Sequence, residues 1–103
     1  EVLLASRNRF ALMHELRDAP EPTLSALLER LSPVDLVLIE GYKRDAHPKV
    51  EAHRASTGNP LIASGDPTIR AVASDTAMVL DRPVFDLNDT VAVADFILSE
   101  VGL

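Results

Sequence analysis

The chain has 103 residues, of which 47% are hydrophobic, 25% charged and only 4% aromatic, a balance typical of one compact domain with an aliphatic core. Ten lysines and arginines against sixteen acids give a net charge of -6, which argues against a general nucleic-acid-binding protein because such a protein needs a basic face. There is no cysteine, which excludes disulfides and thiolate sites, and no apolar run is long enough to cross a bilayer. We therefore expect a cytoplasmic protein with a single domain over residues 1–103.

The first third of the chain predicts two strands and a helix. The apolar run "EVLLAS" (residues 1–6) is followed by "RFALMHEL" (residues 9–16) at a spacing that suits a hairpin, although the second segment is also compatible with a helix. An amphipathic helix is predicted next, with Thr23 as its N-cap and Pro33 beyond its end. Its apolar stripe consists of leucines three or four positions apart, Leu24, Leu27, Leu28 and Leu31.

The rest of the chain alternates predicted strands with turns and ends in a helix. "VDLVLI" (residues 34–39) is almost entirely aliphatic, which favours a strand covered on both faces of a parallel sheet. Shorter strands are predicted for "KVEAHR", "TIRAVAS" and "PVFDL", at residues 49–54, 68–74 and 83–87. A last helix is expected to begin at Asn88 or Asp89 and to end at Gly102. This alternation predicts an α/β sandwich.

Glu40 is the most informative candidate for a functional residue. It comes directly after the predicted strand 34–39, and ligands of open α/β sheets bind at the carboxyl ends of the strands. Gly41 permits a sharp turn and the close approach of a ligand. A carboxylate in this place suits magnesium, which combines one or two carboxylates with water and phosphate oxygens. Lys43, Arg44 and Lys49 follow and would supply positive charge to anionic ligands.

A second interpretation of the same stretch involves no ligand. Glu40 and Gly41 would then only begin a solvated loop, and the basic residues would form a wet face that balances an acidic protein. The residue pattern alone leaves both interpretations open.

The stretch "DLVLIEGYKRDAHPKVEAHR" (residues 35–54) resembles the signature of the molybdopterin-guanine dinucleotide biosynthesis protein B (MobB) family. In that family a hydrophobic strand ends in Glu-Gly-Phe-Lys and is followed by Pro-Lys-Ile-Glu and an arginine. Tyr42 stands here in place of the usual Phe. The segments "VLLASRNRFALMHEL", "AVASD" and "PVFDLND" resemble other parts of the family, so the likeness covers nearly the whole chain.

The resemblance implies a three-layer P-loop NTPase-like sandwich with a mostly parallel sheet. It implies binding of GTP with Mg²⁺ and assistance to a partner guanylyltransferase that attaches GMP to molybdopterin, by a homodimeric protein. Carried onto this chain, Glu40 would be the magnesium-binding acid of a Walker B-like strand. Gly41, Lys43, Lys49 and Arg54 would lie in the ligand-binding part of the signature.

The phosphate-binding loop GxxxxGK[ST] is missing from this chain. None of its four glycines is followed by Lys-Ser or Lys-Thr. The family carries that loop upstream of the strand that corresponds to residues 1–6, and the chain opens with Glu1 in the middle of an apolar run. We therefore expect the C-terminal part of such a protein, with a sheet incomplete at its N-terminal side, which by itself binds GTP weakly or not at all.

Asp75 follows the predicted strand 68–74, where a P-loop GTPase can recognise guanine through a carboxylate that accepts hydrogen bonds from N1 and N2. The alternative is that Asp75 only turns or caps the chain. Arg7 and Arg9 follow the first strand, where they can line the same crevice or remain simply exposed.

The remaining motifs are weaker. The three histidines, His14, His47 and His53, fit no zinc-binding spacing, and no serine lies in a nucleophile-elbow context. Two hypotheses therefore remain. One is a GTP-binding accessory protein of molybdenum-cofactor synthesis, with molybdopterin as a further possible ligand. The other is a dimerisation or partner-docking module that binds no nucleotide.

Overall fold

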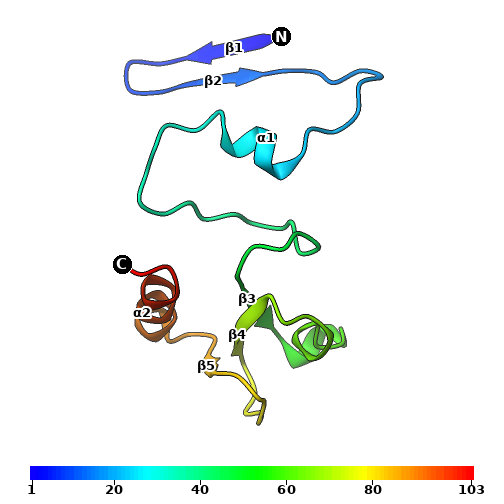
Figure 1. Cartoon of the computed structure of the whole chain (residues 1–103), viewed down its shortest axis with the longest axis vertical. Coiled ribbons are helices and arrows are strands. Elements are labelled where there is room, and N and C mark those ends of the chain that lie inside the picture. Colours follow the sequence, from blue (N-terminus) through cyan, green and yellow to red (C-terminus); the bar gives the residue numbers. More distant parts are fainter. The chain divides into compact units, whose positions relative to one another are not determined.

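The computed structural model describes all 103 residues and divides into two compact units, Glu1–Pro33 and Val34–Leu103. Figure 1 labels the strands and helices of both units. The expectation of one domain over residues 1–103 stays a prediction. None of the helices is both long and apolar enough to cross a membrane.

The first unit begins with a β-hairpin, as the spacing of its two apolar runs predicted. Strand β1 (Val2–Ala5) pairs antiparallel with β2 (Phe10–Met13), with Leu3 opposite Leu12. Side chains alternate between the two faces of a strand, and both faces of this hairpin carry large apolar residues. All of these are exposed, including Leu3 at 63% and Phe10 at 76%.

Helix α1 (Leu24–Leu28) follows in the same unit and begins where it was predicted. The Thr23 hydroxyl accepts a hydrogen bond from the Ala26 amide at 3.1 Å and caps the helix. The predicted continuation of the helix to Leu31 is wrong, because the Arg30 and Leu31 amides bond to carbonyls only three residues back. Tight turns of this kind are common at helix ends, and Pro33 disfavours helical geometry in the residue before it.

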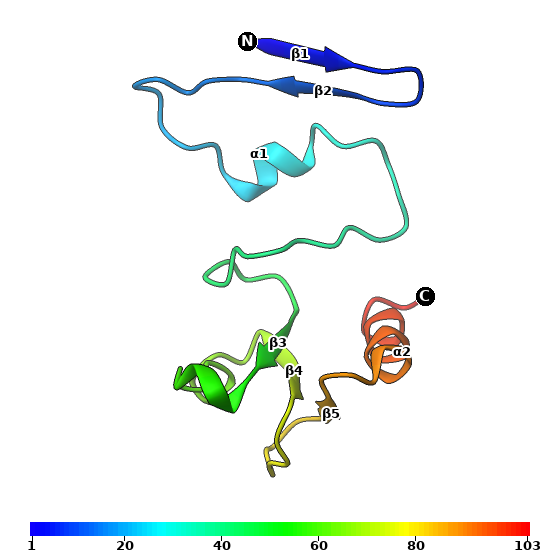
Figure 2. The ribbon, with the colours of Figure 1, turned by 180° about the vertical axis from the view of Figure 1, so that it is seen from behind.

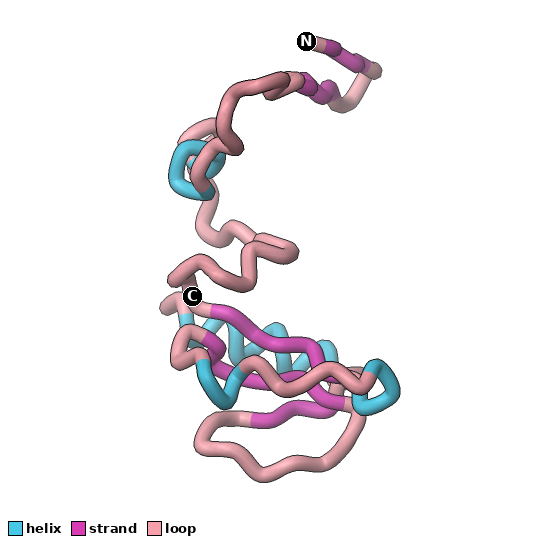
Figure 3. The backbone as a smooth tube through the Cα atoms, turned by 90° about the vertical axis from the view of Figure 1, so that its right-hand side faces the viewer, coloured by secondary structure: helices cyan, strands magenta, loops and turns pink.

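The second unit contains the predicted parallel sheet (Figure 3). Strands β3 (Lys49–His53), β4 (Ile69–Ser74) and β5 (Val84–Asp86) lie in the order β3-β4-β5, and both pairs are parallel. The register of β3 against β4 is irregular between Lys49 and Val50. The predicted α/β class with a parallel sheet is therefore confirmed.

The core of the second unit lies around the central strand β4, whose Val72 is fully buried. Val72 packs with Ala63 of the short 3-10 helix η2 (Ala63–Gly65) on one face of the sheet. Ala73 points to the other face, where its register partner Phe85 meets Phe96 of helix α2 with ring centroids 5.4 Å apart. The two faces are thus covered by different elements.

A second short 3-10 helix, η1 (Ala55–Thr57), follows β3.

Helix α2 (Thr90–Glu100) lies near the C-terminus of the chain (Figure 2). Both of its predicted boundary signals are present. The Asp89 carboxylate accepts from the Ala92 amide at 3.1 Å, so Asp89 is the N-cap. At the other end Gly102 adopts a φ of 79°, and the Leu103 amide reaches back to the Leu98 carbonyl at 2.8 Å. This Schellman arrangement needs a residue that tolerates the left-handed region.

The predicted strand over residues 34–39 is wrong. This segment pairs with no other strand, and Val34 and Leu38 are 63% and 75% exposed. A run of aliphatic residues favours an extended, buried segment, but a strand forms only where a neighbour satisfies its backbone groups. None of the five strands of this chain provides that neighbour.

Candidate functional site

Two of the candidate residues, Arg54 and Asp75, follow strands at the carboxyl edge of the parallel sheet. The strand register sets His53 beside Ser74 and Ser74 beside Asp86, so β3, β4 and β5 all end at this edge. Ligands of open α/β sheets bind in the crevice outside these strand ends. The candidate residues at this edge therefore belong to the segments that leave the three strands.

Asp75 and Arg54 follow the ends of the neighbouring strands β4 and β3, so both lie at this edge. The Asp75 carboxylate accepts from the Ala55 amide through Oδ1 at 3.0 Å, and the Asp75 amide donates to the His53 carbonyl at 3.3 Å. These bonds give Asp75 the turn-stabilising role that was the alternative to base recognition. They leave its Oδ2 without a protein donor, and the Arg54 side chain is exposed.

Ser74 fixes the turn that follows β4. It is 3% exposed and is the buried polar residue of this chain. Its hydroxyl accepts from the Thr76 amide at 3.1 Å and lies 3.3 Å from the Thr76 hydroxyl. The backbone around Asp75 is thus held from both sides.

Lys49 lies at the opposite end of the sheet from Asp75. Strand β3 has five residues, so four steps of about 3.3 Å separate its end residues by about 13 Å. The Lys49 ammonium donates to the carbonyls of Asp45 and His47, the latter at 3.1 Å, and to the Thr68 hydroxyl at 2.8 Å. An ammonium group has three protons, and all three have partners here.

Glu40, Gly41 and Lys43 belong to the segment that leads into β3. All three are exposed, and neither charged side chain forms a hydrogen bond or an ion pair. Gly41 has a φ of 80°, and Tyr42 follows with a φ of 50°. Left-handed geometry is uncommon in a residue with a side chain, and such outliers gather at ligand-binding and switch regions.

Magnesium fits the single carboxylate of Glu40 only if phosphate and water supply its remaining ligands. No group of three or more His, Cys, Asp and Glu side chains that could hold a metal exists in the chain. The free carboxylate of Glu40 offers the one protein ligand that magnesium needs when phosphate and water complete its shell.

The three histidines are divided between the two units of the chain. The ring of His14 lies 3.8 Å from Glu1 in the first unit, while the other two belong to the second unit. The Nδ1 atom of His47 is buried without a partner.

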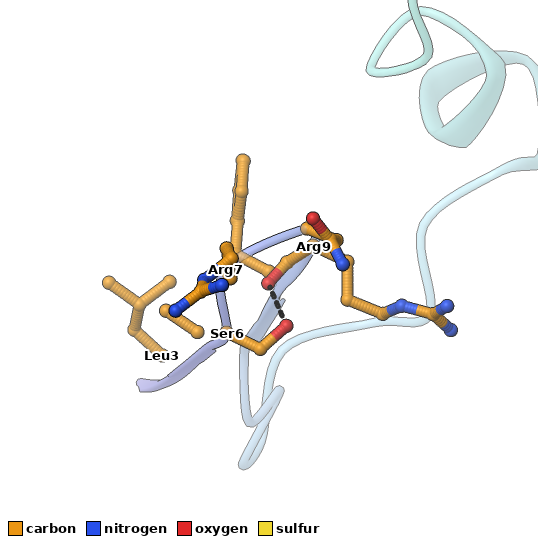
Figure 4. A pocket seen from close by; sticks show the side chains of 7 residues that line it. Leu3, Ser6, Arg7 and Arg9 are labelled. Atoms are coloured by element: carbon orange, nitrogen blue, oxygen red, sulfur yellow. Dashed lines mark hydrogen bonds between the residues drawn. The ribbon is translucent and has the colours of Figure 1, made fainter.

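The tip of the hairpin carries two arginines that do not converge. Residues 6–9 form the turn, which is closed by bonds from the Ser6 amide and hydroxyl to the Arg9 carbonyl at 2.8 and 3.2 Å. Figure 4 shows the Arg7 and Arg9 side chains pointing to opposite sides of the tip. The hollow at the tip is open, and both arginines are among the residues that line it.

Comparison with known proteins places the chain among its relatives. Residues 1–75 match the model of the family described as "Molybdopterin guanine dinucleotide synthesis protein B". The chain belongs to this MobB family. The match includes the Glu40 segment and all of β3 and β4, and it ends at Asp75.

Two relatives of the chain are both described as "Molybdopterin-guanine dinucleotide biosynthesis adapter protein". The Escherichia coli K12 protein is 37% identical over 101 residues, which are 95% of this chain and 58% of that protein. The Haemophilus influenzae protein is 36% identical over 100 residues, 94% of this chain and 54% of that protein. The chain therefore spans little more than half the length of these relatives.

The sequence analysis missed the residues that hold the MobB segments in place. Glu51 in β3 accepts from the amides of Ile62 and Ala63 at 2.9 and 2.7 Å. Thr68 joins Lys49 to Asp66, whose carboxylate accepts from the Thr68 hydroxyl at 2.6 Å. The hydroxyl and then the amide of Thr68 lower the pKa of Asp66 below its ordinary value of 3.8. Only the polar "DPT" turn hinted at such a role.

Proposed function

We propose that this chain is part of a cytoplasmic, GTP-binding adapter protein of molybdopterin guanine dinucleotide biosynthesis. The observation that carries the proposal is the family match over residues 1–75, because it contains both the Glu40 segment and Asp75. The names of the two relatives point to the same pathway and to an adapter role. GTP and Mg²⁺ as ligands follow from the resemblance to P-loop NTPases.

In this proposal Glu40 holds magnesium, directly or through water, the role that the family resemblance gives to the acid of a Walker B-like strand, although no strand directly precedes Glu40 in the structure. Bound magnesium would neutralise phosphate charge and fix the orientation of the phosphates. Lys43 and Arg44 are exposed beside Glu40 and are free to approach phosphate oxygens. Lys49, by contrast, already uses its protons on protein acceptors, so its earlier assignment to phosphate is the least supported of the group.

Asp75 is proposed to recognise guanine, with Arg54 beside it at the ligand edge. A carboxylate has about four acceptor positions, so the bond from the Ala55 amide leaves room for guanine N1 and N2. In a full-length protein that binds GTP, Asp75→Asn should reduce the preference for GTP over ATP. An unchanged preference would leave Asp75 with its turn-stabilising role alone.

The phosphate-binding loop is proposed to belong to a part of the protein outside these 103 residues. The chain has no GxxxxGK[ST] sequence and matches just over half of each relative. Each bond to a charged phosphate oxygen contributes about 1.5–3 kcal/mol, so without the loop affinity should fall by several powers of ten.

Calorimetric titration with Mg-GTP tests this division of the site. We expect no saturable binding to the 103-residue chain and saturable binding to a protein that includes the loop. Micromolar affinity of the chain alone would contradict the proposal, and so would a full-length protein that fails to bind GTP.

The exposed hairpin provides a surface that favours homodimerisation. The alternative function, a partner-docking module, would use the same surface. The two-stranded sheet β1-β2 has an unpaired edge on each side and apolar residues on both faces. Such hairpins are marginal by themselves and tend to pair with further strands. We propose that strands of two copies continue one sheet here. Light scattering on Leu3→Lys should show a shift toward monomer, whereas Arg30→Lys, an exposed change outside the hairpin, should leave the mass unchanged.

The adapter role requires a guanylyltransferase partner, with molybdopterin as a possible further ligand. Binding of the full-length protein to a molybdopterin guanylyltransferase should be measurable by biolayer interferometry. If GTP binds but no transferase does, the nucleotide part of the proposal would stand and the adapter part would fall.

A further inference from the structure

Lys49 is held by three acceptors from two segments that meet at the amino end of the sheet. Two of them, the carbonyls of Asp45 and His47, lie in the segment that follows Glu40. The third is the Thr68 hydroxyl at 2.8 Å, in the turn that leads into β4. The half-buried ammonium thus joins the Glu40 segment to the rigid start of the central strand.

The Thr68 end of this connection is itself fixed. The Asp66 carboxylate accepts from the Thr68 hydroxyl at 2.6 Å and from its amide at 2.9 Å, so the hydroxyl directs its lone pairs toward Lys49. Arg82, which precedes β5, donates through Nη1 to the carbonyls of Asp66 and Ile69 at 3.0 and 2.7 Å. We call Lys49, Thr68 and Asp66 the Lys49 clamp.

The path from the clamp to Glu40 is short and tightly turned. The Asp45 amide donates to the Tyr42 carbonyl at 3.2 Å, which closes a turn next to the carbonyl that Lys49 grips. Gly41, which follows Glu40, and Tyr42, the first residue of this turn, both have positive φ. A single left-handed residue with a side chain costs of order 1 kcal/mol and persists only where its surroundings hold it. The clamp supplies such a hold.

We propose that Lys49 is a positioning residue, which fixes residues 41–48 through the Lys49 clamp and so sets the place of the Glu40 carboxylate, and that it does not contact phosphate. This inference rests on the magnesium role proposed for Glu40. In this role the clamp supports a metal ligand. Loss of such a supporting interaction typically costs tenfold to a hundredfold in metal affinity or activity.

The test uses the full-length protein and two GTP affinities, one with excess Mg²⁺ and one in EDTA. Their quotient is the magnesium dependence. Glu40→Gln should lower it, and Lys49→Met and Thr68→Val should lower it about tenfold. GTP affinity in EDTA should stay close to that of the wild type. Thr68→Ser keeps the hydroxyl and should retain the magnesium dependence.

Two matched controls separate the clamp from general effects of charge and hydroxyl loss. Arg70→Met removes an exposed cation from the neighbouring strand, and Thr90→Val removes a hydroxyl without a hydrogen-bond partner at the start of α2. Neither should change the magnesium dependence. Amide exchange checks the fold: exchange at Asp45 should accelerate in Lys49→Met and Thr68→Val, while exchange at Val72 in β4 should not.

Three results would overturn the inference. A direct phosphate contact would make Lys49→Met weaken GTP in EDTA and leave Thr68→Val like the wild type. A purely structural role would lower the thermal midpoint of both variants without changing the magnesium dependence. If Glu40→Gln itself leaves the magnesium dependence unchanged, the proposed role of Glu40 fails and its positioning falls with it.

Discussion

Removal of the Glu51 carboxylate should destabilise the second unit far more than removal of an ordinary surface carboxylate. Glu51 accepts from the Ile62 and Ala63 amides at 2.9 and 2.7 Å. Ala63 is 1% exposed, so in Glu51→Ala its amide would be left unsatisfied at a cost of about 1–3 kcal/mol. The Ile62 amide can turn to water because Ile62 is 40% exposed, which limits its loss to about 1 kcal/mol. The sum is about 2–4 kcal/mol.

Urea unfolding followed by circular dichroism measures this loss. With a slope of about 1–2 kcal/mol per molar urea, the midpoint of Glu51→Ala should fall by at least about 1 M. The control is Glu100→Ala, since Glu100 meets Arg70 at 3.2 Å on the surface, where such a pair contributes about 0–1 kcal/mol. Equal midpoints for the two variants would refute the reasoning, because they would mean that the two amide bonds of Glu51 contribute no more than an exposed ion pair.

Three further changes probe other parts of the second unit. Because hydrogen bonds from Thr68 lower the pKa of Asp66, this carboxylate stabilises the fold above pH 3.8 and the contribution disappears as pH falls through the lowered value; Asp66→Asn should flatten the acid limb of a stability-against-pH curve. Gly102→Ala at a φ of 79° should lower the free energy of unfolding by about 1 kcal/mol, while Ala94→Gly inside α2 offers a comparison of similar size but different cause. Val72→Ala removes fully buried methyl groups and should cost about 1.5–3 kcal/mol in the same urea assay, whereas Val79→Ala, at a 99% exposed position, should cost almost nothing.

Local signals in the sequence predicted the features that depend on neighbouring residues. Thr23, Asp89 and Gly102 mark helix boundaries because capping is a matter of the next three or four residues. The hairpin was predictable for the same reason, since its turn joins adjacent runs. The prediction of a strand over residues 34–39 was wrong, because a strand forms only beside a neighbouring strand, and the composition of the segment does not specify that neighbour.

The candidate site divides in the same way. Asp75 and Arg54 were proposed as ligand-binding residues separately, and the structure sets them at one edge because strand ends in a parallel sheet share that edge. Lys49 was predicted to contact an anionic ligand because it follows Glu40 in a basic stretch, and that role stays a prediction; its hydrogen bond to Thr68, 19 positions away, could not be predicted from the stretch. Periodicity in the sequence does not indicate hydrogen bonds between side chains so far apart along the chain. It likewise does not indicate the hydrogen bonds from the Ile62 and Ala63 amides, between β3 and β4, to Glu51.

The bare connection between β4 and β5 offers a practical opportunity. Residues 75–83 contain no helix, and Val79 in their middle is 99% exposed. The chain has no cysteine, so Val79→Cys would introduce its sole thiol. A fluorophore attached there would sit on the loop that starts at Asp75 without touching the core. Such a label would give an optical test of whether a nucleotide binds at the sheet edge, as proposed for Asp75.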